Sequence, residues 1–215
     1  TQYISEVKTS ANKTRLIPFE FSTTQTYMLE FGNQYIRFFK DKGQITESNK
    51  TITAITAANP AVVTSNAHGY SNGDFVIITG VVGMTEVNGK TFKVADKTTN
   101  TFELQDVDGT DINSSGYTAY SSGGIANKIY QITTNYTTAQ LFDLKFAQSA
   151  DVLYITHNSH EVSKLSRTGH TSWTLSEVDF GETGPYLSAN TTATTLTPAS
   201  SGTGTGVNIT ASSTT

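Results

Sequence analysis

Hydrophobic and polar residues alternate most regularly between Tyr27 and Phe39, where two apolar-rich runs flank a short polar break. Strict alternation is typical of β-strands that bury one face. The break contains Gly32-Asn33, a pair suited to a two-residue hairpin loop of type II′. The pattern therefore predicts a β-hairpin in which Phe31 faces Gln34 across the turn.

The same alternation sorts the side chains of the hairpin onto two faces, because successive residues of a strand point to opposite sides. The apolar face comprises Tyr27, Leu29, Phe31, Ile36 and Phe38, and we expect it to join the core. The mixed face comprises Met28, Glu30, Tyr35 and Arg37. On that face we expect Glu30 and Arg37 to be diagonal neighbours.

Further strands are predicted on both sides of the hairpin. Residues 3–7 and 15–21 alternate in the same way, and Pro18 places the second of these strands at a sheet edge or at a bulge. Between residues 51 and 125, short branched runs are separated by turn pairs such as Asn72-Gly73. They predict strands at 51–56, 61–64, 74–79, 91–95 and 101–105, a spacing typical of a small barrel or sandwich.

Residues 128–133 resume the alternation seen before this module. We expect them to pair with residues 38–45, which would bring Ser48 and Ala126 together and make the module an insertion. Beyond that point, residues 139–146 have the spacing of a short helix with a threonine cap. Strands are predicted at 151–156, 161–165 and 171–180, and Trp173 is expected in the core.

Composition agrees with an all-β fold and narrows the classes of function that the chain could have. Only 15% of the residues are charged, and Thr, Ser, Gly, Tyr, Phe and Val are abundant, which favours strands and turns. The chain has no Cys, so it has neither disulfides nor thiolate metal ligands. A net charge of −4 argues against nucleic-acid binding, and no apolar run reaches membrane-spanning length. The start at Thr1 leads us to expect a piece of a larger protein.

Residue types with catalytic or binding potential occur, but their spacing matches no known chemistry. His157 and His160 flank a predicted turn and lack the helical geometry of a metalloprotease pair. Asp106, Asp108 and Asp111 fail the calcium-loop template and suit Asp-Gly turn chemistry better. We therefore predict no catalytic, metal or cofactor site. Three loop aromatics, Tyr70, Tyr117 and Tyr120, form a candidate sugar-stacking surface, with loop packing as the alternative.

Two stretches carry a resemblance to virion proteins of short-tailed phages. The first is Leu16-Ile-Pro-Phe-Glu-Phe21 with Tyr27-Met-Leu-Glu-Phe-Gly32 and Tyr35-Ile-Arg-Phe-Phe39. The second is Ala147-Gln-Ser-Ala-Asp-Val-Leu-Tyr154, His157 and Lys164 to Leu175. Together they resemble the tail nozzle, or tail tubular protein B. This resemblance implies a homo-oligomeric ring that contacts other tail proteins in the virion, made in the host cytoplasm.

The module between the two stretches carries a second resemblance. Its residues include Pro60-Ala-Val-Val-Thr64, His68-Gly69, Asn72-Gly-Asp74, Asn88-Gly89 and Thr101-Phe-Glu-Leu104. The pattern resembles the β-rich first catalytic-cysteine half-domain of ubiquitin-activating enzymes. Since the chain lacks Cys and an adenylation-type glycine loop, the resemblance implies a shared β-barrel without the activity of that enzyme.

These observations lead to one expected architecture and two expected functions. Residues 1–48 plus 127–190 are predicted to form a discontinuous antiparallel β domain with one short helix, interrupted by a β-barrel module at 49–126. Residues 191–215 are expected to begin a further domain. The first functional hypothesis is a non-enzymatic structural part of a phage tail, at the nozzle or tube end. The alternative is a carbohydrate-binding, host-recognition module of the virion.

Overall fold

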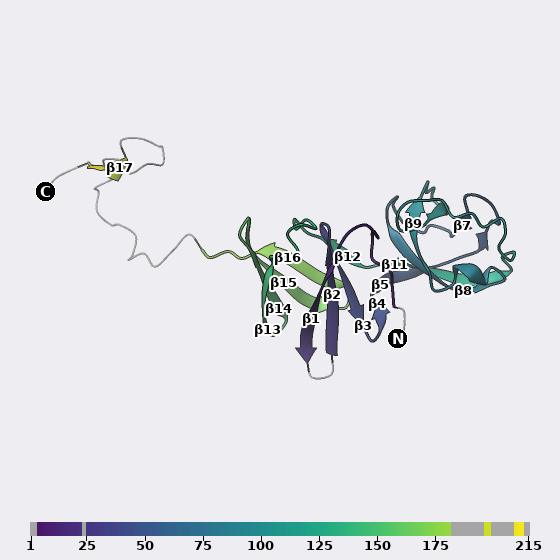
Figure 1. Ribbon diagram of the computed structural model, residues 1–215, viewed down its shortest axis with the longest axis horizontal. Helices are drawn as coiled ribbons and strands as arrows, with labels where there is room; N and C mark the ends of the chain where they lie inside the picture. Colours follow the sequence, from purple (N-terminus) through teal and green to yellow (C-terminus); the bar gives the residue numbers. More distant parts are fainter. Residues whose placement is uncertain (1–3, 23–24, 182–195, 199–208, 213–215) are drawn as a thin grey trace. The chain divides into compact units, whose positions relative to one another are not determined.

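The computed structural model describes residues 4–22, 25–181, 196–198 and 209–212, and it is built from antiparallel β-sheets (Figure 1). The predicted all-β antiparallel class is confirmed. The chain divides into two compact units, Thr1–Val178 and Asp179–Thr215. In the described part of the chain, helical structure is limited to a single 3-10 turn, Thr85–Val87, so no helix there could cross a membrane.

The first unit contains three sheets. A five-stranded sheet holds β1 (Arg15–Ser22), β2 (Gln25–Gly32), β3 (Tyr35–Lys40), β4 (Gly43–Gln44) and β12 (Gln131–Thr133). A four-stranded sheet holds β13 (Lys145–Ser149), β14 (Val152–His157), β15 (His160–Gly169) and β16 (Ser172–Glu177). A seven-stranded sheet holds β5 (Thr46–Thr51), β6 (Ala54–Ile55), β7 (Val62–Thr64), β8 (Phe75–Val82), β9 (Thr91–Ala95), β10 (Thr101–Gln105) and β11 (Ser122–Ile129).

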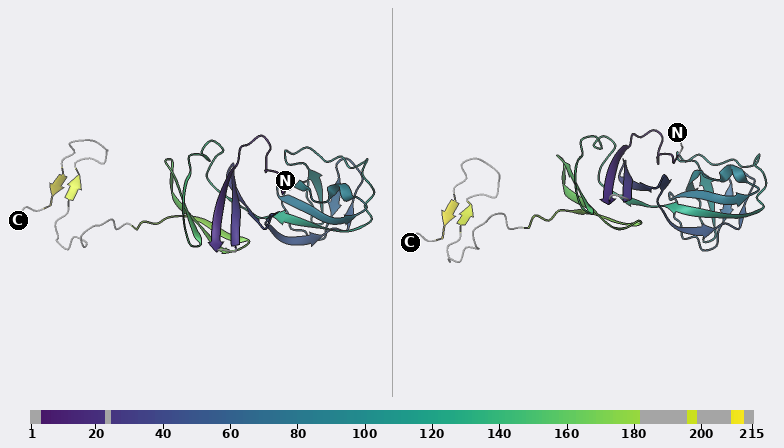
Figure 2. Two further views of the ribbon diagram at one scale, coloured as in Figure 1. Left: turned by 60° about the horizontal axis from the view of Figure 1, so that its bottom comes forward. Right: turned by 90° about the horizontal axis from the view of Figure 1, so that it is seen from below.

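The five-stranded and four-stranded sheets share one hydrophobic core and form a sandwich (Figure 2). One sheet contributes Phe19, Tyr27, Leu29, Phe31, Ile36 and Phe38, and the other contributes Leu153, Ile155, Leu165 and Trp173. Trp173 is buried, as predicted, and stacks on Phe38 with ring centroids 4.5 Å apart. The alternating strands of both sheets therefore bury their apolar faces against each other.

The hairpin forms, but its register is displaced by two positions. Phe31 pairs with Ile36 and Gly32 with Tyr35, so the two-residue loop is Asn33-Gln34 and not Gly32-Asn33. The predicted pairing of Phe31 with Gln34 was wrong. Because side chains alternate with period two, a two-residue slip keeps every side chain on its predicted face. Tertiary hydrogen bonds hold this loop, since the Gln34 N–H donates to the Tyr136 carbonyl oxygen at 2.8 Å.

The module has its own core but is not a closed barrel. Its hydrogen-bonded strand order is β5-β11-β8-β9-β10-β7-β6, with β5 and β6 at the two edges. These edges are consecutive in the chain: the Ile52 N–H donates to Gly124, and the Thr53 N–H donates to Thr64 across the sheet. The bend between them brings both edges around a core that includes Ile78, Phe92, Phe102 and Leu104.

The strands that flank the module pair with each other, as predicted, although nearer to the hairpin loop. In β12, Gln131 pairs with Arg37 and Ile132 with Ile36, and the Tyr130 N–H donates to the Ile45 carbonyl oxygen. Next to them, β5 pairs with β11, including Lys50 with Ala126. The two ends of the proposed insertion are thus adjacent, and the domain boundaries at 48 and 127 stay a prediction.

Two local predictions were wrong. Residues 139–146 do not form a helix, because residues 138–143 are turns and β13 begins at Lys145. Leu141 and Leu144 are nevertheless buried, because both side chains pack into the sandwich core. Residues 4–7 form no strand.

The second unit is described only in part. β17 (Leu196–Pro198) pairs with β18 (Ile209–Ala211) in a two-stranded antiparallel sheet. The predicted domain end at residue 190 and the glycines at 202, 204 and 206 lie outside the described residues.

Candidate functional site

The predicted sugar-stacking surface loses one of its three rings. Tyr70 is buried, and its hydroxyl donates to the Ala126 carbonyl oxygen at 2.9 Å, while its ring packs edge-on against Phe102. The Tyr70 ring is therefore not open for sugar stacking, because it lies in the module core. Tyr117 and Tyr120 are partly buried against the same core. The Tyr120 hydroxyl donates to the Gly123 carbonyl oxygen at 2.9 Å.

The histidine and aspartate groups make local structure. His157 and His160 face each other across the β14–β15 hairpin, with ring centroids 5.2 Å apart. Asp106 accepts hydrogen bonds from the N–H groups of Asp108 and Thr110, the turn chemistry predicted for it. Within the part of the chain that the structure describes, no group of three or more His, Asp or Glu could hold a metal ion.

A candidate interaction surface lies on the side of the five-stranded sheet that faces away from the sandwich core. We call it the outer face, and it comprises Leu16, Pro18, Met28, Glu30, Tyr35, Arg37 and Phe39. Leu16 is 58% exposed and Met28 is 39% exposed, and Ile4 beside them is 47% exposed. Two cavities of about 240 and 410 Å³ adjoin there, and both are lined by Ile4, Met28 and Phe39. Large apolar side chains left open in one place are typical of an interaction site.

Sequence reasoning placed Met28 on the mixed face but overlooked Leu16 and Ile4. The available signal was the alternation of residues 15–21, which directs Leu16 away from the core that Phe19 enters. Ile4 could not be assigned in this way, because residues 4–7 follow no strand pairing.

One end of the outer face is a buried polar cluster. The Tyr35 hydroxyl donates to Glu30 at 2.5 Å, and burial raises the pKa of the Glu30 carboxyl despite this hydrogen bond and the nearby Arg37 charge. Arg37 is fully buried, with its guanidinium carbon 4.6 Å from the centroid of the Phe75 ring on β8. Its Nη1 and Nη2 atoms have no hydrogen-bond partner in the structure. Glu30, Tyr35 and Arg37 are thus all buried, and none of the three side chains is open to solvent.

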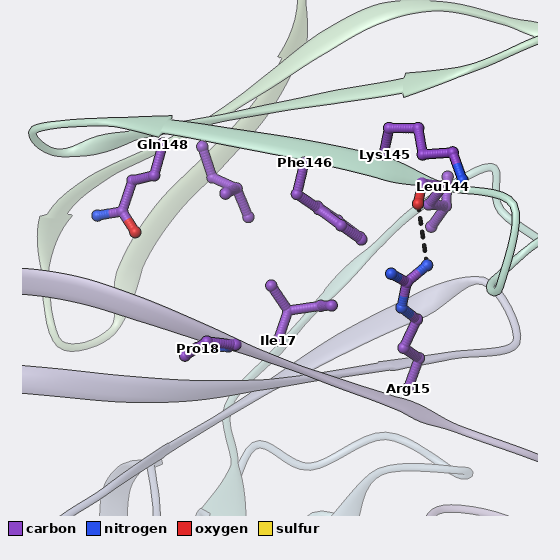
Figure 3. Close-up of a pocket in the computed structure, with 8 residues that line it drawn as sticks. Arg15, Ile17, Pro18, Leu144, Lys145, Phe146 and Gln148 are labelled. Carbon is purple, nitrogen blue, oxygen red and sulfur yellow. Dashed lines mark hydrogen bonds between the residues drawn. The ribbon is translucent and has the colours of Figure 1, made fainter.

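The open side of the sandwich contains a cleft of about 430 Å³ between β1 and β13 (Figure 3). Ile17 and Phe146 lie on its opposite walls, and polar side chains bridge its two ends. Arg15 Nη1 donates to the carbonyl oxygens of Leu141 and Leu144 at 2.9 Å each. Gln148 bonds both backbone groups of Glu20, accepting from its N–H at 3.1 Å and donating to its carbonyl oxygen at 2.7 Å.

The Gln148 bridge occupies backbone groups at the free edge of β1. Gln148 occupies one backbone donor and one acceptor, and Pro18 removes a further donor from the same strand. Side-chain coverage and proline are common ways in which proteins block edge-to-edge association. The outer face is therefore a better candidate for association than this edge.

Comparison with known proteins assigns only the module. The chain matches no curated protein. Residues 58–129 match the model of one family, the ubiquitin-activating enzyme E1 FCCH domain. That range spans five of the seven strands of the module sheet, β7 through β11, and leaves out β5 and β6 at 46–55. The inserted module is thus similar to the FCCH domain, as its residues indicated.

Proposed function

We propose that this protein is a non-enzymatic structural subunit of a phage tail, at the nozzle or the end of the tail tube, and that it acts by self-assembly. The observation that carries the proposal is the outer face, where exposed Ile4, Leu16 and Met28 surround two adjoining cavities. A solvent-exposed apolar patch of this kind is stabilised when a second protein surface covers it.

The resemblance to tail nozzle proteins supports the same surface. Its first stretch, residues 16–39, forms β1, β2 and β3, which carry the outer face. Its second stretch, residues 147–175, supplies the opposite sheet of the sandwich. The sandwich thus acts as a rigid support for the assembly surface, and the module is an addition to it.

Charge substitutions on the outer face test this proposal. Leu16→Glu and Met28→Glu place a carboxylate where a neighbouring subunit would bury apolar surface. We expect both to lower self-association of the intact protein at least tenfold, as measured by native mass spectrometry and sedimentation. The matched control is Val82→Glu, since Val82 is 55% exposed but lies on the module. Closed rings seen by electron microscopy of the intact protein would support the proposal, and equal association of all three variants would refute it.

The alternative function is glycan recognition by the module. Tyr117 and Tyr120 are only partly buried, so part of each ring remains accessible. Binding on a glycan array that is lost in Tyr117→Ala, together with a monomeric intact protein, would favour this alternative over assembly.

A further inference from the structure

Arg37 on β3 is a buried cation whose hydrogen-bonding groups are largely unused. Its exposed fraction is 0%, and neither Nη1 nor Nη2 has a hydrogen-bond acceptor in the structure. The remaining donor, Nε, lies 3.4 Å from Gln131 Oε1. A buried charge is costly unless it is paired and hydrogen-bonded, so proteins normally supply an acceptor at such a place.

Lys8 brings a second cation to the same two aromatic rings. Its Nζ lies 5.0 Å from the centroid of the Tyr35 ring and 5.6 Å from that of Phe75. The guanidinium carbon of Arg37 lies 5.3 Å and 4.6 Å from the same two centroids. Burial and then the Arg37 charge lower the pKa of Lys8, because the two cations repel each other. The ring faces attract both cations but supply no compensating negative charge.

The neighbouring carboxylates do not pair with these cations. Among the residues that the structure describes, none of the ion pairs within 4 Å includes Arg37 or Lys8. Glu30 is opposite Arg37 in register, but it accepts a hydrogen bond from Tyr35, and burial raises the pKa of its carboxyl. Asp74 pairs with a different lysine at 3.3 Å. The cluster therefore has an excess of positive charge.

A further donor without a partner lies on the same face of the sheet. Gln44 pairs with Phe39, which is two positions from Arg37 on β3, so all three side chains point to the outer face. Gln44 Oε1 accepts from Ser5 Oγ at 2.7 Å, and its Nε2 is buried with no acceptor. Ser5 and Phe39 line the 240 Å³ cavity, which provides space beside these donors.

We propose that Arg37, Lys8 and Gln44 form a binding site for one small inorganic anion of the size and charge of chloride. The ion accepts hydrogen bonds from the unpaired nitrogens of these three side chains, and its charge balances the excess of cations. A monovalent ion is favoured, because Glu30 already supplies part of the negative charge. This site goes beyond the proposed function, since it does not depend on self-assembly.

Chloride-dependent stability tests the site in solution. A ligand that binds only the folded chain raises its melting temperature. We expect the melting temperature of the wild type to rise when chloride replaces gluconate at constant ionic strength. In Lys8→Gln and in Gln44→Ala, we expect the apparent affinity for chloride to fall at least tenfold. Lys13→Gln is the matched control, because it removes the same charge from an exposed side chain.

Two results in solution would overturn the site. One is a melting temperature of the wild type that does not respond to chloride. The other is an equal response of the wild type, Lys8→Gln and Gln44→Ala, because chloride would then act elsewhere on the chain.

Bromide locates the ion directly. In crystals of the wild-type chain grown in sodium bromide, we expect an anomalous-scattering peak within hydrogen-bonding distance of Arg37 Nη1 or Nη2. A water molecule at this position without an anomalous peak would show that water satisfies the buried donors, and it would overturn the proposal.

Discussion

Gly32 shows how one residue supports the hairpin for a reason other than turn geometry. A Cβ atom on Gly32 would lie 2.1 Å from the Tyr35 ring, which crosses directly over its backbone. The positive backbone angle belongs to Gln34, with φ 62°, and not to this glycine. The ring of Tyr35 can reach Glu30 because position 32 has no side chain.

Gly32→Ala should therefore destabilise the protein by overpacking, by about 1–3 kcal/mol. Displacement of the Tyr35 ring would also break its hydrogen bond to Glu30. Urea unfolding measures the effect, and Gly116→Ala is the matched control, since no atom lies within 4 Å of the Cβ it would add. Equal unfolding midpoints for the two variants would show that the ring does not occupy this position.

Glu30 predicts a pH dependence of stability. Burial raises the pKa of its carboxyl above the ordinary value of 4.5, so the folded protein holds this proton more tightly than the unfolded chain. The unfolding free energy should consequently fall as pH rises from 4.5 through the raised pKa. Glu30→Gln keeps an acceptor for Tyr35 but cannot titrate. We expect the difference in unfolding free energy between wild type and this variant to change with pH over that window, and a constant difference would contradict the assignment.

At the scale of elements, the sandwich combines a shared hydrophobic core with one edge strand, β1, whose backbone is partly covered by a side chain. Gln148 on β13 forms hydrogen bonds with both backbone groups of Glu20 on β1, so these two groups are not available to another strand. We expect these two hydrogen bonds to contribute little to the free energy of unfolding, because both partners lie near the surface of the cleft.

Gln148→Ala should leave the unfolding free energy nearly unchanged, within about 0.5–1.5 kcal/mol for the hydrogen bonds lost. It should instead raise the rate of aggregation, because the edge of β1 becomes available for pairing. Light scattering during prolonged incubation measures this rate. Ser149→Ala, an exposed change in the same strand, is the control. Equal aggregation of both variants would show that Gln148 does not protect the edge of β1.

At the scale of the whole molecule, the module and the sandwich have separate hydrophobic cores within the first unit. A third, small cluster contains Phe75, Val107 and Ile129, close to where the chain enters and leaves the module. In the same cluster, Ile129 pairs with Thr46. The interpretation of the module as an insertion into the sandwich stays a prediction, which a deletion can test.

Deleting residues 50–125 and bridging the ends with a short Gly/Ser linker should leave a folded remainder. The sandwich keeps its complete core, although Arg37 loses the ring of Phe75 that covers it. We expect a cooperative thermal transition at a lower temperature than in the full chain, and independent folding of the excised module. Loss of cooperative unfolding in the remainder would refute the domain boundaries.

The sequence by itself determined the features that depend on local periodicity. Alternation assigned Leu29 and Phe38 to the core and Glu30 and Arg37 to the other face, and it identified the strands that flank the module. The motif residues of the module likewise sufficed to identify its resemblance to the FCCH domain. These properties survive a change of register, because side-chain direction in a strand repeats every two residues.

Only the tertiary structure decided those features in which contacts between distant residues override the local preference of the chain. The loop moved to Asn33-Gln34 because residues 134–138 bond to it, and residues 145–149 became a strand because β14 pairs with them. Tyr70 packs into the module core through a bond to Ala126, and Ser10 bonds to Asp108, which is 98 positions away in the chain. No local pattern encodes these pairings, since each depends on residues that meet only after the sheets have formed.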